Sequence, residues 1–200
     1  TVRLAVGISD GLPKLVVQRL LQPAMAEPNL RLLCHEDELD DLLGDLALHR
    51  LDVVLSDRPA PSNANIKLYN HALGSSAVSW YGSAALVKAA RKTFPASLAE
   101  VPVLLPTEHT AVRTRLDHWF EHHGIRPRIV GEFEDSALLK TFGASGMGVF
   151  PAAEWGHENL ISKYGVQRLG ACEGVSEHFF AIGTEKKVQH PLVQLLLESA

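Results

Sequence analysis

The sequence predicts an α/β protein made of two Rossmann-like lobes, and its first sixty residues carry the clearest signal. Short apolar runs at 2–8, 30–36 and 51–56 are bounded by polar turns, which is typical of buried strands. Between these runs, leucines recur at spacings of three to four residues over 12–20 and 39–46, so each set lies on one face of a helix. Strands that alternate with helices favour a parallel sheet covered by helices.

A second alternating unit follows the polar, proline-rich segment "RPAPSNAN" at 58–65. Strands are expected at 66–73, 77–82, 101–106, 128–133, 147–151 and 177–185, and helices at about 83–91, 110–123, 135–145 and from 188 onward. We expect two crossover segments, near 71–77 and 168–176, because the last helix needs the first sheet to cover it. Lobe I is then 1–72 plus 174–200, lobe II is 73–173, and a ligand cleft lies between them.

Composition excludes several classes of function. A net charge of −4 over 200 residues supplies no broad attraction for nucleic acid or for anionic lipid. No apolar run approaches the roughly 18 residues of a membrane span, so we expect a soluble protein with no membrane partner. Cys34 and Cys172 are expected to be lone buried thiols in a reducing cytoplasm. The chain enters its first strand directly after Thr1, which suggests a fragment, the C-terminal part of a longer protein.

The segment "DHWFEHHG" at 117–124 contains His118, Glu121 and His122 in the H-x-x-E-H spacing of some zinc peptidases. At about 100° per residue, Val112, Leu116, Trp119, Phe120 and His123 instead form the apolar side of a helix. His118 and Glu121 point away from that side, and a peptidase needs a third ligand and an oriented outer shell. We therefore expect a solvated helical face without a metal.

The segment "GASGMG" at 143–148 resembles the G-x-S-x-G turn of serine hydrolases, but Met147 stands where the second glycine belongs. A helix end that turns into a strand explains these glycines better. The sequence contains no G-x-G-x-x-G and no P-loop, so we expect no nucleotide chemistry and no cofactor.

Several phrases, in order along nearly the whole chain, resemble LysR-type transcriptional regulators. They are "LHRLDVVLSDRP", "RTRLDHWFEHHGIRPRIVGEFEDSALLKTFGASGMGVFPAAE" and the closing "QHPLVQLLLESA". The phrases "VGISDGLPKLVVQRLL" and "VGEFEDSALLKTFGA" are most similar to a sodium-responsive branch that activates sodium/proton antiporter genes.

The resemblance implies an effector-binding region of periplasmic-binding-protein type II fold, without the N-terminal winged helix-turn-helix. It implies no enzymatic activity, a small effector (sodium or a small organic molecule) between the lobes, and a homodimer or tetramer in the cytoplasm. Promoter DNA would be bound by the missing N-terminal domain. Helices at about 12–22 and 110–123 are the surfaces that correspond to the family's dimer contacts. A free-standing solute-binding protein or a small α/β enzyme remains the alternative.

We infer the candidate effector contacts from the ends of the predicted strands, because ligands of open α/β sheets lie beyond the carboxyl ends of the strands. Ser9 and Asp10 follow the first strand, and Thr107, Glu108 and His109 follow a strand of lobe II. The resemblance implies effector contacts in both loops. Simple helix capping is the alternative explanation for each residue.

Carboxylates are frequent at these strand ends, and they bear on the identity of the effector. Arg58 and His109 are the few cationic or donor groups there. Oxygen ligands suit a hard cation, so Asp10, Glu36, Asp57 and Asp135 are candidate sodium ligands. Carboxylates are also common at helix starts for dipole reasons alone. The complete acidic set is Asp10, Glu36, Asp37, Asp57, Glu134 and Asp135.

Overall fold

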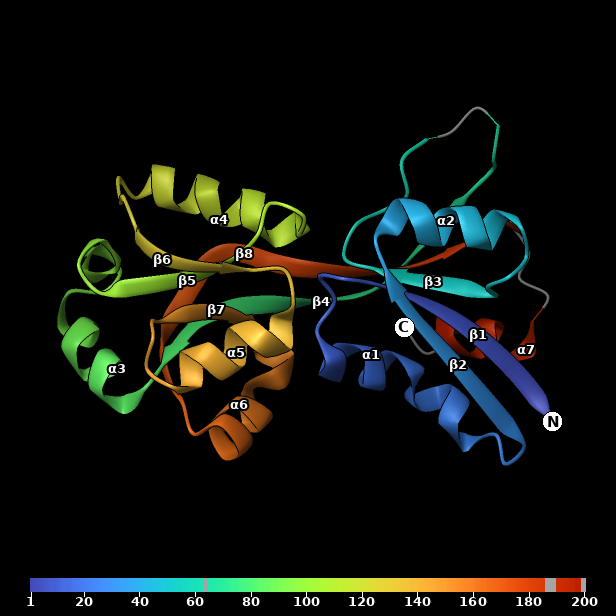
Figure 1. Ribbon diagram of the computed structural model, residues 1–200, viewed down its shortest axis with the longest axis horizontal. Coiled ribbons are helices and arrows are strands. Elements are labelled where there is room, and N and C mark those ends of the chain that lie inside the picture. The colour runs from blue at the N-terminus through green and yellow to red at the C-terminus, as the bar shows by residue number, and fades with distance from the viewer. Residues whose placement is uncertain (63–64, 186–189, 199–200) are drawn as a thin grey trace. The chain divides into compact units, whose positions relative to one another are not determined.

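The computed structural model describes residues 1–62, 65–185 and 190–198. The chain divides into two compact units (Figure 1). Unit 1 comprises Thr1–Ser75 and His178–Ala200, and unit 2 comprises Ser76–Glu177. The regulatory lobes expected at 1–72 with 174–200 and at 73–173 stay a prediction about functional domains.

Unit 1 contains the parallel strands that the opening of the sequence predicts. Strand β1 (Val2–Ser9) lies between β2 (Leu30–Asp37) and β3 (Val53–Ser56) and is parallel to both. The last part of β8 (Gln167–Gly183) pairs antiparallel with β3, so that Val54 faces Ile182. β1 and β3 are apolar and buried over most of their length, as expected for strands covered on both faces.

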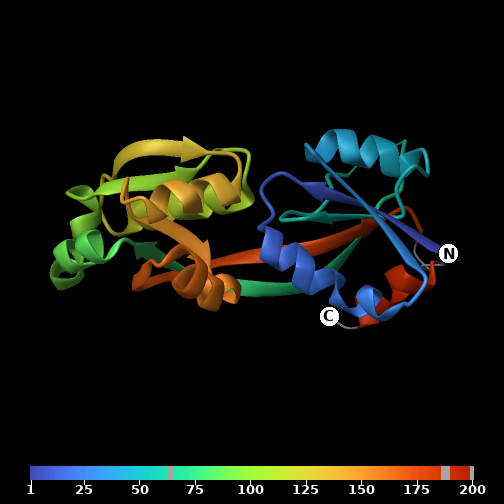
Figure 2. The same cartoon turned by 60° about the horizontal axis from the view of Figure 1, so that its bottom comes forward.

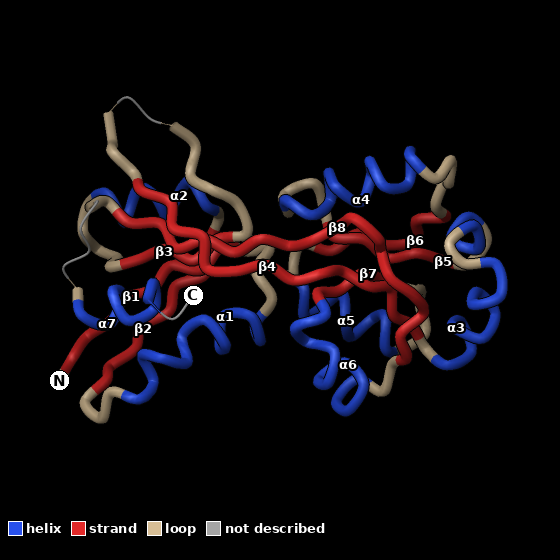
Figure 3. The backbone as a smooth tube through the Cα atoms, turned by 180° about the vertical axis from the view of Figure 1, so that it is seen from behind, coloured by secondary structure: helices blue, strands red, loops and turns tan. Residues whose placement is uncertain are grey.

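Helices cover both faces of this sheet. Helix α1 (Lys14–Leu21), continued by η1 (Gln22–Ala26), lies on one face, and α2 (Leu39–Ala47) lies on the other (Figures 1 and 3). Leu42, Leu43 and Leu46 of α2 pack on Ala5 and Val54. Helix α7 (Pro191–Glu198) belongs to unit 1 and contacts η1.

Unit 2 has two cores, one on each face of its strands. Strand β5 (Pro102–Pro106) is parallel to β6 (Arg128–Phe133), and β4 (Tyr69–Gly82) is antiparallel to β7 (Phe150–Ala153). Successive residues of a strand point to opposite faces. Accordingly, Trp80 enters one core and Tyr81 enters the other.

The helices of unit 2 follow the same division. Helix α4 (Ala111–His122) packs on the Trp80 core, together with α3 (Ala84–Ala90) and η3 (Ala96–Ala99). Between α3 and η3, η2 (Arg91–Thr93) buries no residue. Helix α5 (Ser136–Ala144), η4 (Glu154–Gly156) and α6 (His157–Tyr164) lie on the side of the Tyr81 core, and α4 and α5 lie on opposite faces (Figures 1 and 2).

Three expectations about elements are wrong. The strands expected at 66–73 and 77–82 are one strand, β4, and β8 begins ten residues before the expected residue 177. Both strands therefore run continuously across the boundary between the units, where loops were expected. Helix α6 was not expected, because its eight residues "HENLISKY" bury one leucine, Leu160, and give almost no periodic signal.

The cysteines differ in part from expectation. Both thiols are free, but Cys34 is exposed and only Cys172 is buried. Burial raises the pKa of the Cys172 thiol to about 12, so this thiol stays protonated and unreactive. None of the described helices is long and apolar enough to cross a membrane.

Candidate ligand-binding site

The carboxyl ends of the three parallel strands of unit 1 meet at one edge, and five of the predicted site residues lie there. The pairing places Ser9 beside Asp37, with Glu36 one residue earlier in the same strand. Asp57 and Arg58 directly follow β3, whose Leu55 faces Ile8. The sequence therefore identified a set of polar side chains that the fold of unit 1 does gather: Ser9, Asp10, Glu36, Asp57 and Arg58.

Ser9 is the most informative of this set. Its side chain is 5% exposed, and its hydroxyl has no hydrogen-bond partner among the described residues. Helix α1 begins five residues later behind Pro13, without a capping side chain and without an acidic residue in its first turn. A buried hydroxyl beside an uncapped helix N-terminus is suited to a ligand that brings oxygen atoms and negative charge.

The carboxylates of this edge are already engaged. Glu36 lies 3.5 Å from Nζ of Lys14, and Asp57 Oδ1 lies 3.5 Å from Nε of Arg58. Asp10 is exposed. Three of the residues predicted as sodium ligands, Asp10, Glu36 and Asp57, thus share this edge with the cationic side chains of Lys14 and Arg58. Sequence reasoning gave no weight to Lys14.

Unit 2 repeats the arrangement. Pro106 at the end of β5 faces Phe133 at the end of β6, so Thr107, Glu108 and His109 are brought to the same edge as Glu134 and Asp135. His109 Nε2 lies 3.7 Å from Glu134 Oε1, and both groups are exposed. Asp135 caps α5 by accepting a hydrogen bond from the amide of Ala137 at 3.0 Å. For Asp135 the capping alternative is therefore realised.

Thr107 has the same property as Ser9. Its Oγ1 is buried and has no hydrogen-bond partner among the described residues, while its backbone amide donates to the Phe133 carbonyl at 3.1 Å. Helix α4 follows four residues later, again without a capping side chain or an acidic residue in its first turn. Thr110, at the N-cap position, donates its hydroxyl to the Thr107 carbonyl instead.

Arg113, in the first turn of α4, holds this loop in place. Its buried guanidinium donates to the Pro106 carbonyl at 2.9 Å, to Glu132 at 2.6 Å and to Asp117 at 3.0 Å. Burial alone would lower the pKa of Arg113, but the hydrogen bonds to Glu132 and Asp117 outweigh it and raise the pKa. The guanidinium of Arg113 is thus paired with two carboxylates of unit 2.

Lys140 is a further cationic group near this edge that sequence reasoning missed. It lies on α5, five residues after the cap Asp135, and is partly buried. Burial lowers the pKa of Lys140, while the charges of Glu177 and Asp135 act to raise it. The sequence did indicate that Lys140 lies close to the buried face of α5. Lys140 directly follows Leu139 and lies three residues before Gly143, and both of these residues are buried.

The H-x-x-E-H helix presents its polar residues to solvent. Val112, Leu116, Trp119 and Phe120 are buried, whereas His118, Glu121 and His122 are exposed. His123 was expected on the buried side, but it is exposed at the end of α4 and stacks on Trp119 with ring centroids 4.6 Å apart. No group of three or more potential metal-ligating side chains is found in the described part of the chain.

One glycine of "GASGMG" follows the end of α5, as expected, whereas another lies inside the helix. Gly143 lies inside α5 and packs directly on the Phe150 ring, where a Cβ would overlap that ring. Gly146 is the residue in left-handed conformation, with φ of 91°. Ser145 donates its hydroxyl to the Phe142 carbonyl at 2.7 Å, in keeping with a helix end rather than a nucleophile.

Comparison with known protein families identifies the chain. Residues 2–200 match the family described as the LysR substrate binding domain. The chain belongs to this family. The fold-class expectation is confirmed by the same finding together with the structural neighbours, which are LysR effector-binding domains of periplasmic-binding-protein type II-like fold.

Curated relatives include the transcriptional activator protein NhaR of Escherichia coli (strain K12) and of Shigella flexneri. Each is 34% identical over 190 residues, which are 94% of this chain and 62% of the relative. The chain therefore spans less than two thirds of the length of these relatives. They are transcriptional regulators, as the resemblance implied.

Solved structures with the same fold include CbnR, a LysR family transcriptional regulator, with TM-score 0.77 and 16% identity over 98% of this chain and 68% of that chain. The cofactor-binding domain of the Cbl transcriptional regulator gives TM-score 0.79 and 18% identity over 100% of this chain and 87% of that chain. The BenM effector binding domain, solved with its effector benzoate, gives TM-score 0.73 and 15% identity over 100% of this chain and 91% of that chain.

Proposed function

We propose that this LysR substrate binding domain senses a small oxygen-rich effector, most simply an organic anion, through Ser9 and Thr107. The observation that supports this proposal is that, among the described residues, each unit has one buried, unpartnered hydroxyl at a strand end that precedes an uncapped helix. Two unsatisfied hydroxyls are costly unless a ligand completes their hydrogen bonds. The BenM effector binding domain, solved with benzoate, and the effector binding domain of QuiR, solved in complex with shikimate, support this class of ligand.

Sodium is the second candidate effector, and the sequence resemblance to a sodium-responsive branch favours it. Its expected ligands Glu36, Asp57 and Asp135 have a cationic neighbour or a capping role, which weakens them as cation ligands. Asp10 and Glu134 add carboxylate oxygens at the same two edges. We place the organic anion first because the unpartnered groups are donors as well as acceptors, and sodium accepts no hydrogen bonds.

The proposed output is regulation of transcription in the cytoplasm. The effector would bias the protein between alternative conformations by its differential affinity for them. The bias would pass to promoter-bound winged helix-turn-helix domains in a part of the protein that precedes this chain. Binding rather than catalysis is proposed, because the family and the curated relatives are regulators.

A thermal-shift titration tests the effector. The melting temperature is measured with sodium, lithium and potassium chlorides at fixed ionic strength, and with benzoate and shikimate as potassium salts or neutralised acids. A ligand that binds only the folded state raises the melting temperature by mass action. We expect an organic acid to stabilise the chain, and Ser9→Ala with Thr107→Val to abolish the shift, while the control Ser162→Ala, at an exposed hydroxyl of α6, retains it. Stabilisation by sodium but not by potassium or by any acid would refute the anion and support the cation.

The proposed partner is a second copy of the chain, which would pack through the exposed faces of α1 and α4. Gln18 and Thr114 are exposed on these helices, and Ala89 is an exposed control on α3. Arginine at Gln18 or Thr114 is expected to weaken self-association at least tenfold by sedimentation velocity, whereas Ala89→Arg leaves it unchanged. Equal sedimentation of all three variants and the parent chain would reject these faces.

A further inference from the structure

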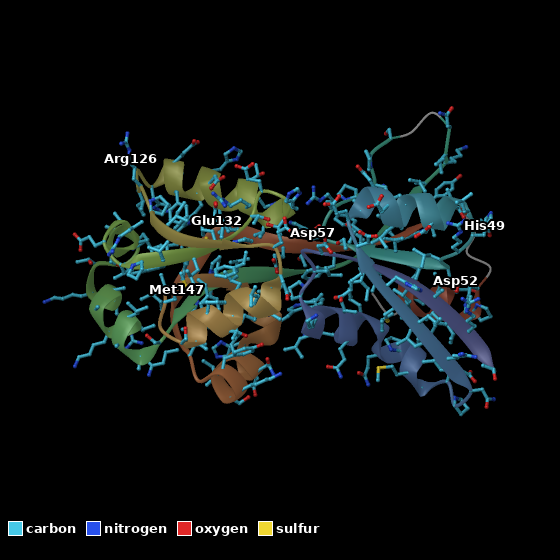
Figure 4. All side chains as sticks on the ribbon, in the orientation of Figure 1. His49, Asp52, Asp57, Arg126, Glu132 and Met147 are labelled. Atoms are coloured by element: carbon cyan, nitrogen blue, oxygen red, sulfur yellow. The ribbon has the colours of Figure 1, made fainter. Side chains whose placement is uncertain are left out.

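A cavity of about 200 Å³ lies within unit 1, at the opposite end of β3 from the candidate effector site. Asp57 follows the carboxyl end of β3, whereas the cavity is built around Asp52, which precedes the amino end. Figure 4 shows His49 and Asp52 together at one end of unit 1 and Asp57 at the other. The lining residues are His49, Leu51, Asp52, Gly183, Thr184, Glu185, His190 and Val193.

The register of the sheet explains why these residues meet. Val54 faces Ile182 in the antiparallel pair of β3 and β8, so Gly183 and Thr184 fall beside Val53 and Asp52. On the other side, α2 ends at Ala47, and the chain reverses through His49 with φ of 58°. Three separate parts of the chain, at 49–52, 183–185 and 190–193, thus line one partly open space.

The imidazole ring of His190 lines the cavity, and both of its nitrogens are hydrogen-bonded to the backbone. Its Nδ1 accepts a hydrogen bond from the Leu192 amide at 3.1 Å, which leaves that nitrogen without a proton. Its Nε2 then donates to the Arg3 carbonyl at 2.8 Å. The 4.0 Å approach of His190 Nε2 to Asp52 is therefore not an ion pair in this arrangement.

The lining carries two negative charges, those of Asp52 and Glu185, beside the polar side chains of His49 and Thr184. Asp52 uses Oδ2 to accept from the Ala5 amide at 2.8 Å, and its other oxygen is not engaged by any hydrogen bond seen in the described residues. Glu185 adds a second carboxylate. The nearby Arg50 pairs with Asp45 at 3.4 Å. The carboxyl end of α2 adds a partial negative charge on the same side.

An apolar wall completes the cavity. Leu51 and Val193 are both buried and face the same space as the carboxylates. These apolar side chains offer no ligand atom to a metal ion, whereas a short hydrocarbon chain would bury apolar area against them. The chemistry of the lining therefore combines negative charge, hydrogen-bond acceptors and an apolar surface.

We propose that this cavity is a second binding site, specific for a small organic cation that carries N–H donors on a short apolar chain, such as an alkylammonium. The ammonium group bonds to Asp52 and Glu185, and the hydrocarbon part contacts Leu51 and Val193. Because Val193 belongs to α7, the ligand joins the last helix of the chain to the end of α2. The site is separate from Ser9 and Thr107 and does not depend on the proposed effector.

The experiment is an NMR titration of the ¹⁵N-labelled chain with n-butylammonium at fixed ionic strength. Tetramethylammonium tests charge without N–H donors, and butyrate tests the same hydrocarbon length with the opposite charge. We expect saturable shifts at the amides of His49 and Thr184 with n-butylammonium alone. The double variant D52N/E185Q is expected to weaken binding at least tenfold, whereas D41N/E173Q, with the same change in net charge at two exposed residues outside both sites, leaves it unchanged.

Three results would overturn the site: no saturable shift with n-butylammonium, equal shifts with butyrate, or equal affinity of D52N/E185Q and the parent chain. The side-chain amide introduced by D52N keeps an oxygen that can accept from the Ala5 amide, and the urea midpoint of D52N/E185Q checks that unit 1 remains folded. A further variant, S9A/T107V, separates the two proposals. It is expected to lose the response to organic acids and to keep that to n-butylammonium.

Discussion

Arg113 shows at the scale of one residue how unit 2 holds its candidate loop. Replacing it by methionine keeps the apolar stem but leaves the buried Pro106 carbonyl without its donor. We expect Arg113→Met to lower the free energy of unfolding by about 2 kcal/mol, the cost of losing a charged hydrogen-bond donor to a buried acceptor. Urea denaturation measures it, and Arg126→Met, at an exposed arginine (Figure 4), is the control and changes stability little. Equal midpoints for both variants would contradict this role.

Gly143 and Gly44 make a matched pair of helical glycines with opposite expectations. A Cβ at Gly143 overlaps the Phe150 ring, whereas a Cβ at Gly44 meets nothing within 4 Å. Gly143→Ala is therefore expected to cost about 1–3 kcal/mol through overpacking. Gly44→Ala is expected to stabilise the chain by up to about 1 kcal/mol, because alanine loses less backbone entropy in a helix. Thermal unfolding of the two variants checks both signs, and destabilisation by Gly44→Ala would show that the space beside α2 is misjudged.

At the scale of elements, side-chain hydrogen bonds connect η4 to β4 and β8. Ser79 donates its hydroxyl to Glu154 at 2.5 Å, and Arg168 lies 3.3 Å from the same carboxylate. The Ser79 hydrogen bond, then Arg168, lower the pKa of Glu154 against the opposing effect of burial. A lowered carboxyl pKa stabilises the fold fully above the ordinary value near 4.5, and this contribution is lost as the pH falls through the folded value.

We therefore expect Glu154→Gln to reduce the urea midpoint at pH 7 and to have progressively less effect below pH 4.5. Glu158→Gln, an exposed change on α6, serves as the control and is expected to show no such trend. The measurement is a series of urea curves between pH 7 and pH 3. A constant difference between Glu154→Gln and the parent chain over that range would exclude the contribution of the charge.

Helix α4 carries a prediction about metals. Because His118, Glu121 and His122 lie on its solvent face, we expect a chelator such as EDTA to leave the melting temperature unchanged. The double variant H118A/H122A is expected to stay within about 0.5 kcal/mol of the parent chain, as surface substitutions usually do. Stoichiometric zinc bound by the parent chain and lost by H118A/H122A would reverse the interpretation of this helix.

The sequence predicted elements best where burial imposes a period. β1, β3 and α2 bury regular apolar sets, and their observed bounds lie within about two residues of the expected ones. β4 and β8 were harder, because each is exposed on parts of both faces where it passes from one unit to the other, so that no alternation marks its full length.

The candidate site could be predicted in part for a similar reason. Parallel strands bring their carboxyl ends to one edge whatever the side chains are, so Ser9 and Thr107 were placed correctly at strand ends. What the sequence could not supply is which polar groups are already satisfied. Asp135 as a cap, Glu36 with Lys14, and the free hydroxyl of Ser9 are distinguished only by their neighbours in space.

At the scale of the whole molecule, the two units are connected differently to the chain. Unit 2 is one continuous segment, Ser76–Glu177, whereas unit 1 is assembled from residues before and after it. β8 supplies unit 1 with the strand that pairs with β3, and α7 covers η1. Unit 1 is thus completed by the last residues of the chain.

This connectivity sets an order during synthesis on the ribosome. Residues 76–177 leave the exit tunnel as a complete folding unit, while β1, β2 and β3 wait for a strand that has not yet been made. The partner edge of β3 stays unpaired through that interval, and an unpaired apolar strand edge invites pairing with other chains. In the sheet, β8 lies between β3 and β4. Early folding of the central segment therefore offers β4 as a neighbour to the growing β8, which shortens the time for which the edge of β3 is open.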